Sequence, residues 1–576
     1  MKKNIYSELF FYLLKILNHN QKKSAIALLM LMVLGMILEI FLLKNLLVFL
    51  NFLTNSNSKI PEIIIFIQKN IQVQEVSILV LLLFVFTFLT KTIISIILRW
   101  KESKFIFSLK AQISERLFHG YLKLPFIYHQ RTNTAKILKN ITFEVEQFSI
   151  LIFAISTLIL ELLVLAGISI YLMFFDFFIS AICVLAFLIF GYFFNLFNKK
   201  KLRTMSVARL KHQDGRIKSI MEGLAGMREI KLWAKENDIL NNFSLHNDAI
   251  AKISISTSLR NALSKPSFEI FMLIFLSIFL SYFITRDLLT ASVIPIFGIY
   301  LAAAYRLVPS IAQIVQSIQS IQFNLRCAKN LSDDVDKFNA EENNKANLKS
   351  KISFNSELEI SDCVFAYKSK EEQPKELVLN NLNLKIKKGD FVGIQGASGS
   401  GKSTLIDIIL GLHKPLSGKI LVDNTNIDGN LTKWQSLIGC VPQEVFILDD
   451  TLKKNIAFGV SSDQISEKKL NECLVFANLK NFVLTLEDGV ETVIGEKGAR
   501  LSGGQKQRIG IARAMYNNPE ILIFDEATSS LDIETEAKII SEINSFKRKK
   551  TMIIVSHNSE ILKNCDYIFN IESKKI

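Results

Sequence analysis

Residues 391–404 read FVGIQGASGSGKST, and this stretch decides the fold of the second half of the chain. The first four residues are apolar and typical of a strand, a glycine-rich turn follows, and the next run, TLIDIILGL, has a helical composition. A strand, a glycine-rich turn with a lysine and a helix together form a phosphate-binding loop. From Ile352 onward, β-rich runs alternate with helical ones, which predicts an α/β domain with a largely parallel central sheet.

The phosphate loop needs these residue types for physical reasons. Glycines let the backbone N–H groups curl around phosphate oxygens in conformations that a Cβ atom would oppose. Lys402 would neutralise the β- and γ-phosphates of ATP, and Ser403 would ligate Mg²⁺ at the positive end of a helix. The residues that we predict to bind nucleotide in this loop are Gly396, Ser398, Gly399, Ser400, Gly401, Lys402, Ser403 and Thr404.

A second buried strand is predicted at 521–524, which reads ILIF and is followed by Asp525 and Glu526. An aspartate at the carboxyl end of such a strand is suited to hold Mg²⁺ and its water. The next residue, Glu526, can polarise the water that attacks the terminal phosphate. Acidic residues often end strands simply because they are solvated, but the phosphate loop upstream favours the catalytic interpretation.

Leu501, Ser502, Gly503, Gly504 and Gln505 spell LSGGQ between these two motifs. Together the motifs resemble the nucleotide domain of ABC transporters, whose signature sequence stands at this place. The resemblance extends from about residue 356 to the end of the chain, and every expected motif occurs in order.

The resemblance assigns further roles. Tyr367 matches the aromatic residue that stacks on adenine, and Gln443 in VPQE matches the Q-loop, which takes part in catalysis and contacts Mg²⁺. Asp532 matches the D-loop, and His557 in IIVSHN matches the catalytic switch histidine. GEKG at 495–498 is similar to the exporter X-loop. The implied cofactors are ATP and Mg²⁺, and the implied activity is ATP hydrolysis coupled to transport.

The first half of the chain is predicted to be an all-α membrane domain of the ABC exporter type. Half of all 576 residues are hydrophobic, and six apolar segments approach or reach the ~20 residues that a helix needs to cross a bilayer. These segments are 25–47, 76–100, 148–171, 177–197, 267–284 and 291–304. We therefore predict a membrane domain over 1–329, a polar linker over 330–351 and a nucleotide-binding domain over 352–576.

The loops between these segments orient the membrane domain. The two long loops, which follow the second and the fourth segment, are rich in Lys and Arg, whereas the others carry few. By the positive-inside rule the long loops, both termini and the nucleotide domain are cytoplasmic, which places the protein in the cytoplasmic membrane with no cleaved signal peptide. The long loops keep helical periodicity, so we expect the membrane helices to continue into the cytosol. Segments 136–140 and 223–231 resemble coupling helices.

Composition argues against other classes of protein. The formal charge of +15 is spread between apolar blocks and forms no basic stripe, so we predict no nucleic-acid partner. The six cysteines lie far apart without a CxxC pair, so neither a disulfide framework nor a zinc site is expected. A soluble ABC protein is excluded by the six apolar segments.

Two copies of the chain should act together, because in this family the signature motif of one nucleotide domain closes on ATP held by another. The chain has one of each motif. Since Glu526, His557 and LSGGQ are all intact, a homodimer is favoured over a heterodimer.

The cargo is the least specified part of the prediction. Charged residues within the apolar segments either face a cavity or form intramembrane pairs, and the deepest cations are Lys91 and Arg306. Two inward cations suit an anionic cargo. The membrane half also resembles bacterial lipid-linked oligosaccharide flippases at 226–236, around Arg306 and at an outer-loop helix after Pro61. We therefore favour a polyprenyl-diphosphate-linked glycan, with a peptide or lipid exporter second and an ATP-gated channel or receptor third.

Overall fold

The computed structural model describes residues 12, 15–16, 18–53, 73–174, 177–285, 293–345, 352–368, 374–495, 498, 501–527, 533–556 and 558–571. The chain forms two compact units. The helical unit comprises Met1–Leu124 and Arg131–Glu342, and the C-terminal unit comprises Pro125–Gln130 and Asn343–Ile576. The predicted outer-loop helix after Pro61 lies outside the described residues.

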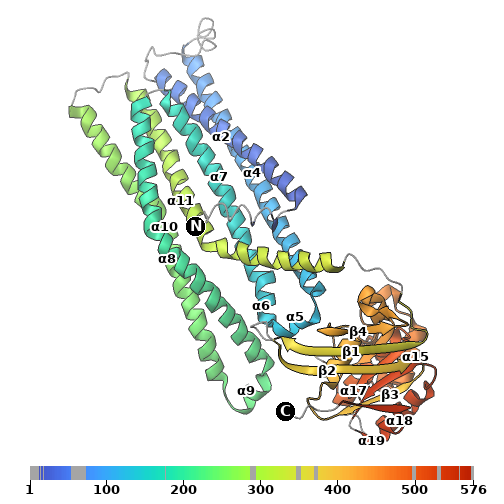
Figure 1. The fold of residues 1–576 in the computed structure, drawn as a ribbon. Helices are drawn as coiled ribbons and strands as arrows, with labels where there is room; N and C mark the ends of the chain where they lie inside the picture. Colours follow the sequence, from blue (N-terminus) through green and yellow to red (C-terminus); the bar gives the residue numbers. More distant parts are fainter. Residues whose placement is uncertain are drawn as a thin grey trace. The chain divides into compact units, whose positions relative to one another are not determined.

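The helical unit is a bundle of long helices (Figure 1). Its elements are α2 (His19–Leu53), α4 (Val73–Lys123), α6 (Thr134–Lys139), η1 (Asn140–Glu144), α7 (Val145–Met173), α8 (Phe177–Ala225), α9 (Met227–Leu232), α10 (Glu236–Thr285) and α11 (Val293–Lys345). Within the described residues, six helices are long and apolar enough to cross a membrane. Five of the six predicted segments lie within one of these helices, and the described part of the sixth, 293–304, lies in α11, so the predicted membrane domain with six spans is confirmed.

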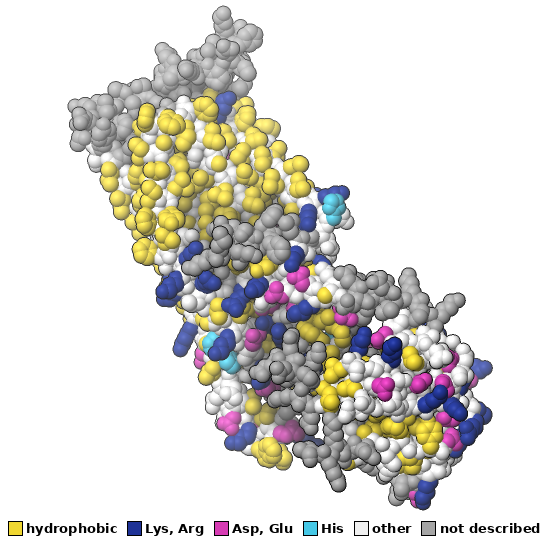
Figure 2. Space-filling view, viewed as in Figure 1, with side chains coloured by type: hydrophobic (Ala, Val, Ile, Leu, Met, Phe, Trp, Pro, Cys, Tyr) yellow, Lys and Arg dark blue, Asp and Glu magenta, His cyan; other side chains and the backbone are white. Residues whose placement is uncertain are grey.

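The helices are much longer than a bilayer requires. α8 has 49 residues, which is roughly 70 Å at ~1.5 Å per residue and exceeds the ~30 Å hydrocarbon layer. Figure 2 shows hydrophobic side chains covering the upper part of the helical unit, with Lys and Arg side chains below them. α8 and α10 pack along each other and are joined by the short α9. The predicted helical extensions beyond the apolar region are therefore present.

The prediction of a linker over 330–351 is wrong for residues 330–345, because α11 continues to Lys345. Leu331 and Val335 are buried, and Phe338 packs edge-to-face on Tyr121 with ring centroids 5.1 Å apart. Asp334 is also buried and accepts hydrogen bonds from Tyr121 and Asn140. The apolar positions recur at i, i+4 and i+7, a helical stripe that the surrounding charges mask in the sequence.

The segment 136–140, which resembles a coupling helix, exposes Lys136 and buries its last two residues within the helical unit. Lys139 pairs there with Glu144 and Asp214, and Asn140 is buried. A different short helix, α5 (Phe126–Arg131), contributes Pro125–Gln130 to the C-terminal unit. The other predicted segment, 223–231, includes the start of α9, where Met227 is exposed.

The C-terminal unit contains two sheets. An antiparallel sheet has the order β2-β1-β4-β5, and a parallel sheet has the order β6-β7-β8-β3-β9. The strands are β1 (Glu357–Lys368), β2 (Pro374–Lys387), β3 (Phe391–Gly396), β4 (Ser417–Val422), β5 (Thr425–Asn426), β6 (Ile438–Val441), β7 (Ile521–Asp525), β8 (Thr551–Val555) and β9 (Tyr567–Ile571). The predicted α/β domain with a parallel central sheet is confirmed.

Eight helices accompany the parallel sheet in the described part of this unit: α12 (Lys402–Ile409), α13 (Leu431–Ser436), α14 (Leu452–Ile456), α15 (Glu467–Phe476), α16 (Lys480–Leu484), α17 (Gly503–Tyr516), α18 (Ile533–Ser545) and α19 (Ser559–Leu562). Among them, α12, α13 and α17 contact the strands of the sheet. All five residues of β8 are buried, as expected for a parallel strand enclosed on both faces. Since β7 and β3 both flank β8, their carboxyl ends lie along one edge of the sheet. Ligands of open α/β sheets bind at this edge.

Candidate functional site

The turn between β3 and α12 has the geometry of an anion cradle. Gly399 and Gly401 adopt φ values of +78° and +99°, which residues with a Cβ atom rarely adopt. A Cβ atom on Gly396 would lie 2.6 Å from Ser400 Oγ and 2.7 Å from the Ile571 carbonyl oxygen. The glycines in the sequence are therefore required by the turn itself.

Polar groups of the turn are arranged for a ligand. Lys402 is buried, and its Nζ atom donates to the carbonyl oxygens of Gly396 at 2.8 Å and Ala397 at 3.1 Å. Ser400 Oγ is buried without a hydrogen-bond partner among the described residues, whereas Ser398 and Ser403 are exposed. An unpaired buried hydroxyl is costly unless a ligand satisfies it. The cradle, the lysine and this hydroxyl together fit a nucleotide phosphate chain.

The carboxyl end of β7 supplies the acidic groups. Asp525 is the last residue of the strand and pairs in register with Val555 of β8. Burial raises the pKa of Asp525, as do the negative charges of Glu526 and Asp407, while the Lys402 ammonium opposes them. A divalent cation would relieve this repulsion, and the oxygens of Asp525 and Ser403 are the ligands that Mg²⁺ prefers. The residues therefore fit the predicted metal.

Glu526 and Gln443 are brought together by the fold. Gln443 Nε2 donates a 2.8 Å hydrogen bond to Glu526 Oε2, although the two residues are 83 positions apart. Glu526 has a φ of +47°, a left-handed conformation that is uncommon for a residue with a long side chain. Backbone strain of this kind persists where the surrounding structure holds it, often at functional positions. The pairing can orient the glutamate toward a water molecule.

An aromatic cluster flanks the phosphate loop. Tyr367, near the end of β1, lies with its hydroxyl 3.1 Å from Thr404 Oγ1 in the first turn of α12. Its ring contacts the buried ring of His413, which also stacks on Phe365 with centroids 5.2 Å apart. Phe126 of α5 contacts the same histidine at 6.0 Å. Sequence reasoning missed His413, because a lone histidine in GLHKPLSG carries no motif.

Replacing Tyr367 by Ala should weaken ATP binding. Stacking of a base on an aromatic side chain contributes about 1–3 kcal/mol, so we expect the Kd for ATP to rise roughly 5- to 150-fold. Tyr367→Phe keeps the ring, loses only the contact with Thr404, and should bind nearly as well as the unmodified chain. Equilibrium binding of a fluorescent ATP analogue measures both variants. Equal affinity for Tyr367→Ala and Tyr367→Phe would contradict the stacking role.

The LSGGQ segment forms the start of a helix. Ser502 caps α17, and its hydroxyl accepts from the Gln505 backbone N–H at 3.2 Å, while Gln505 Oε1 accepts from the Ser502 N–H at 2.8 Å. Ser502 and Gly503 are exposed, and Leu501, Gly504 and Gln505 are partly exposed. A capped helix N-terminus offers backbone N–H groups and positive dipole charge to an anion. His557 and Asp532 lie outside the described residues, so their roles stay predictions.

The two predicted cargo-contacting cations meet in the helical unit. Lys91 on α4 and Arg306 on α11 both pair with Glu39 on α2, and the Lys91–Glu39 distance is 3.0 Å. Arg306 also lies 3.5 Å from Glu161 on α7, whose carboxylate accepts a 2.7 Å hydrogen bond from Ser310. Glu39 and Glu161 are 5% and 3% exposed. The intramembrane ion pairs that the sequence left open are therefore formed, and the cations retain partly exposed surfaces.

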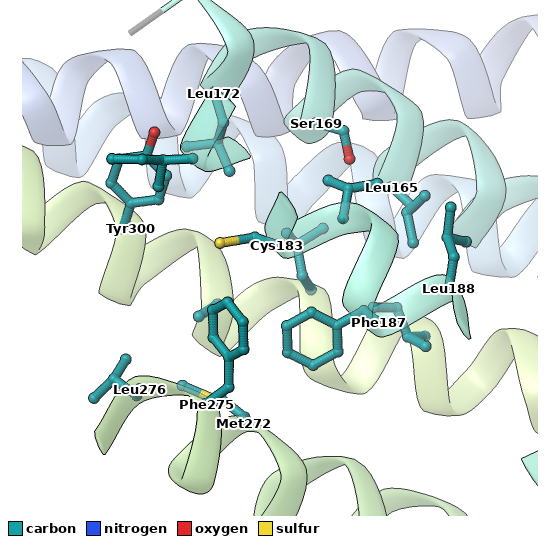
Figure 3. Close-up of a pocket in the computed structure, with 15 residues that line it drawn as sticks. Leu165, Ser169, Leu172, Cys183, Phe187, Leu188, Met272, Phe275, Leu276 and Tyr300 are labelled. Carbon is teal, nitrogen blue, oxygen red and sulfur yellow. The ribbon is translucent and has the colours of Figure 1, made fainter. Parts of the chain in front are cut away.

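An apolar cavity of 70 Å³ lies between α7, α8, α10 and α11 (Figure 3). Leu165, Cys183, Phe187 and Phe275 point into it, and Tyr300 closes one end. Leu165 follows Glu161 by one helical turn, and Leu307 follows Arg306 directly. The cavity and the ion-pair network thus share α7 and α11. Sequence reasoning did not foresee this cavity, because its lining residues are ordinary components of apolar helices.

Comparisons with known proteins agree with this architecture. A family model described as "ABC transporter transmembrane region" matches residues 23–304, and one described as "ABC transporter" matches residues 379–529. The solved structure of a bacterial Atm1-family ABC exporter with ATP bound superposes with a TM-score of 0.76 at 20% identity, covering 96% of this chain and 94% of that one. At this identity the likeness establishes the fold alone.

Curated relatives match part of this chain. A putative export ATP-binding/permease protein of Rickettsia typhi is 41% identical over 220 residues, or 38% of this chain. An ABC multidrug transporter of Aspergillus fumigatus is 39% identical over 225 residues, or 39% of this chain. The matched regions span only 37% and 16% of these two relatives.

Proposed function

This chain belongs to the ABC transporter family, and from that premise we propose that it hydrolyses ATP to move an amphipathic, anionic lipid across a membrane. Its membrane region and its single ATP-binding domain make it a half-transporter of the exporter type. The observation that carries the proposal is the pairing of Gln443 with Glu526 beside an intact phosphate loop. The charged network at Arg306 supports the nature of the cargo.

Each residue of the nucleotide site would have its own role in ATP hydrolysis. The backbone N–H groups of the loop at 397–401 and the Lys402 ammonium bind the phosphate chain, and Tyr367 orients the base. Bound Mg²⁺ would be held by Ser403, Asp525 and Gln443 and would neutralise charge on the phosphates. Glu526 accepts a hydrogen bond from Gln443, which holds its carboxylate where it can orient and polarise the attacking water. His557 would contact the terminal phosphate, as its motif implies.

Two chains would be needed for one catalytic cycle. Ser502 and Gly503 are exposed at the capped end of α17, which suits contact with ATP held by a second copy. A homodimer supplies two equivalent sites, with Asp532 at the boundary between the copies. Closure of the two domains on ATP and reopening after hydrolysis would then move the membrane helices. By the positive-inside rule, the basic loops favour nucleotide domains in the cytoplasm and helices in the cytoplasmic membrane.

The cargo site would combine a polar and an apolar part. Arg306 and Lys91 offer partly exposed cationic groups, and the apolar cavity that shares α7 and α11 with their network would accommodate part of a hydrocarbon chain. An anionic head with an apolar tail matches both, and a polyprenyl-diphosphate-linked oligosaccharide is the cargo that we favour. Peptides and other hydrophobic compounds form the second candidate, because the apolar cavity alone would suit them. A gated channel is a weaker alternative, since Glu526 is retained.

Lys91→Gln tests the charge of the cargo. We expect unchanged basal ATP hydrolysis and at least a several-fold weaker stimulation by a polyprenyl diphosphate, because one cation is lost while Glu39 keeps its pair with Arg306. Lys44→Gln on α2 is the control, because Lys44 forms no ion pair with the described residues. ATPase assays in nanodiscs compare the diphosphate with the uncharged polyprenol. Equal stimulation of the unmodified chain by both lipids would instead favour export of neutral hydrophobic cargo.

A further inference from the structure

A second, polar cavity of 410 Å³ lies in the helical unit between α6, α8 and α11. Arg326 on its wall follows Arg306 by ~20 residues of the same helix, roughly 30 Å along its axis. The polar cavity is therefore separate from the Arg306–Glu39 network, and it shares no residue with the nucleotide loop. Its volume falls within the ~300–1,000 Å³ of small-molecule sites.

The charges on the wall are unbalanced. Five cations line the cavity: Lys136, Lys139, Lys211, Arg326 and Lys337. Three carboxylates line it as well: Asp214, Asp333 and Asp334. The lining thus carries a net charge of +2. An excess of like charge on a concave surface attracts counter-ions of the opposite sign.

Two of the cations, Lys139 and Lys337, form ion pairs with carboxylates. Lys139 is buried and lies 2.7 Å from Asp214 and 3.2 Å from Glu144, and Lys337 lies 2.6 Å from the buried Asp334. Asp334 also receives hydrogen bonds from Tyr121 and Asn140, so its position is fixed. The buried members of these pairs, Lys139, Glu144 and Asp334, thus have charged partners.

The other three cations have no such partner. Among the described residues, neither Lys136 nor Lys211 nor Arg326 forms an ion pair or a side-chain hydrogen bond. They come from α6, α8 and α11 respectively and converge on one cavity. All three side chains are exposed, so water screens part of their mutual repulsion, and an anionic ligand would neutralise the rest.

We propose that this cavity binds a phosphomonoester group. A phosphomonoester carries about −1.5 to −2 charges at neutral pH, which matches the excess on the wall. The planar Arg326 guanidinium suits two phosphate oxygens at once, and Lys136 and Lys211 supply point charges. The remaining volume leaves room for the group that the phosphate esterifies. The phosphomonoester can belong to a soluble metabolite or to a lipid headgroup.

The test uses the purified full-length chain carrying Lys402→Ala, so that the nucleotide loop does not compete for phosphate. The soluble arm measures binding of radiolabelled glycerol 3-phosphate by equilibrium dialysis, with glycerol as the control. The lipid arm measures capture of labelled phosphatidic acid from mixed micelles, with phosphatidylcholine as the control. Saturable binding in the soluble arm supports a metabolite, and binding confined to phosphatidic acid supports a lipid headgroup.

Matched variants assign the binding to this cavity. Arg326→Gln should weaken it at least tenfold, whereas Lys329→Gln, an exposed lysine one turn along α11 that does not line the cavity, should leave it unchanged. Lys211→Gln provides a second, exposed position whose loss should not disturb folding and should also weaken binding. The proposal is overturned if neither probe binds saturably, or if Arg326→Gln and Lys211→Gln bind as tightly as Lys329→Gln.

Discussion

Glu526→Gln is expected to bind ATP normally and to hydrolyse it about 10²- to 10⁴-fold more slowly, the range that a positioned general base contributes. The substitution keeps the size of the side chain and its place beside Gln443, 2.8 Å away. An amide cannot accept a proton from water, so only the chemical step should suffer. Single-turnover hydrolysis and equilibrium ATP binding, measured on the same preparation, separate the two effects.

A matched control is Glu472→Gln on α15, an exposed carboxylate that is not part of the nucleotide site. It should hydrolyse ATP at the normal rate. If Glu526→Gln kept the rate of this control, the assignment of Glu526 as the residue that polarises water would be wrong. If it lost ATP binding as well, Glu526 would have a structural role in the site.

Arg306→Gln should lower the stability of the helical unit by roughly 3–5 kcal/mol, the typical cost of breaking a buried ion pair by removing one partner. The arginine pairs with both Glu39 and Glu161, which are almost fully buried. Without it Glu161 keeps Ser310, whereas Glu39 keeps Lys91. The Glu161 carboxylate would then have no cationic partner among the described residues.

A second substitution should restore part of the stability that Arg306→Gln loses. Adding Glu161→Gln to Arg306→Gln removes the unpaired charge and should restore part of the lost stability. Lys265→Gln is the control, because Lys265 and Glu269 form an exposed pair on one helix that contributes little. Thermal unfolding in detergent gives the unfolding temperatures of these three variants and of the unmodified chain. If Arg306→Gln unfolded at the same temperature as Lys265→Gln, the ion-pair network would not stabilise the helical unit.

Much of the nucleotide site could be predicted from the sequence because its chemistry is local. The loop from Gly396 to Thr404 is contiguous, and Asp525 and Glu526 directly follow a recognisable strand. The hydrogen bond between Gln443 and Glu526 is different, because only the order of β6 and β7 brings these distant residues together. His413 lies beyond sequence reasoning for the same reason: its neighbours Phe126, Phe365 and Tyr367 come from three separate segments.

The membrane half shows the limits of pattern reading more clearly. Hydropathy located the six spans, because each needs a long apolar run. It could not show that Lys91 and Arg306 share Glu39, since pairing depends on how α2, α4 and α11 face one another. The sequence does not predict the end of α11, because Asp334 and Lys337 have the composition of a solvated linker, whereas Asp334 is buried and accepts a hydrogen bond from Asn140. The polar cavity likewise appears only once α6, α8 and α11 are assembled.

Measuring ATP hydrolysis and lipid movement together tests most directly whether this chain uses ATP to move a lipid across a membrane. The purified chain is placed in liposomes that contain a diphosphate-linked oligosaccharide lipid, and a membrane-impermeant probe reports the lipid in the opposite leaflet. We expect movement that requires ATP and stops in Glu526→Gln. ATP hydrolysis without any movement of this lipid would contradict the proposed cargo, and movement that persists without hydrolysis would contradict the proposed motor.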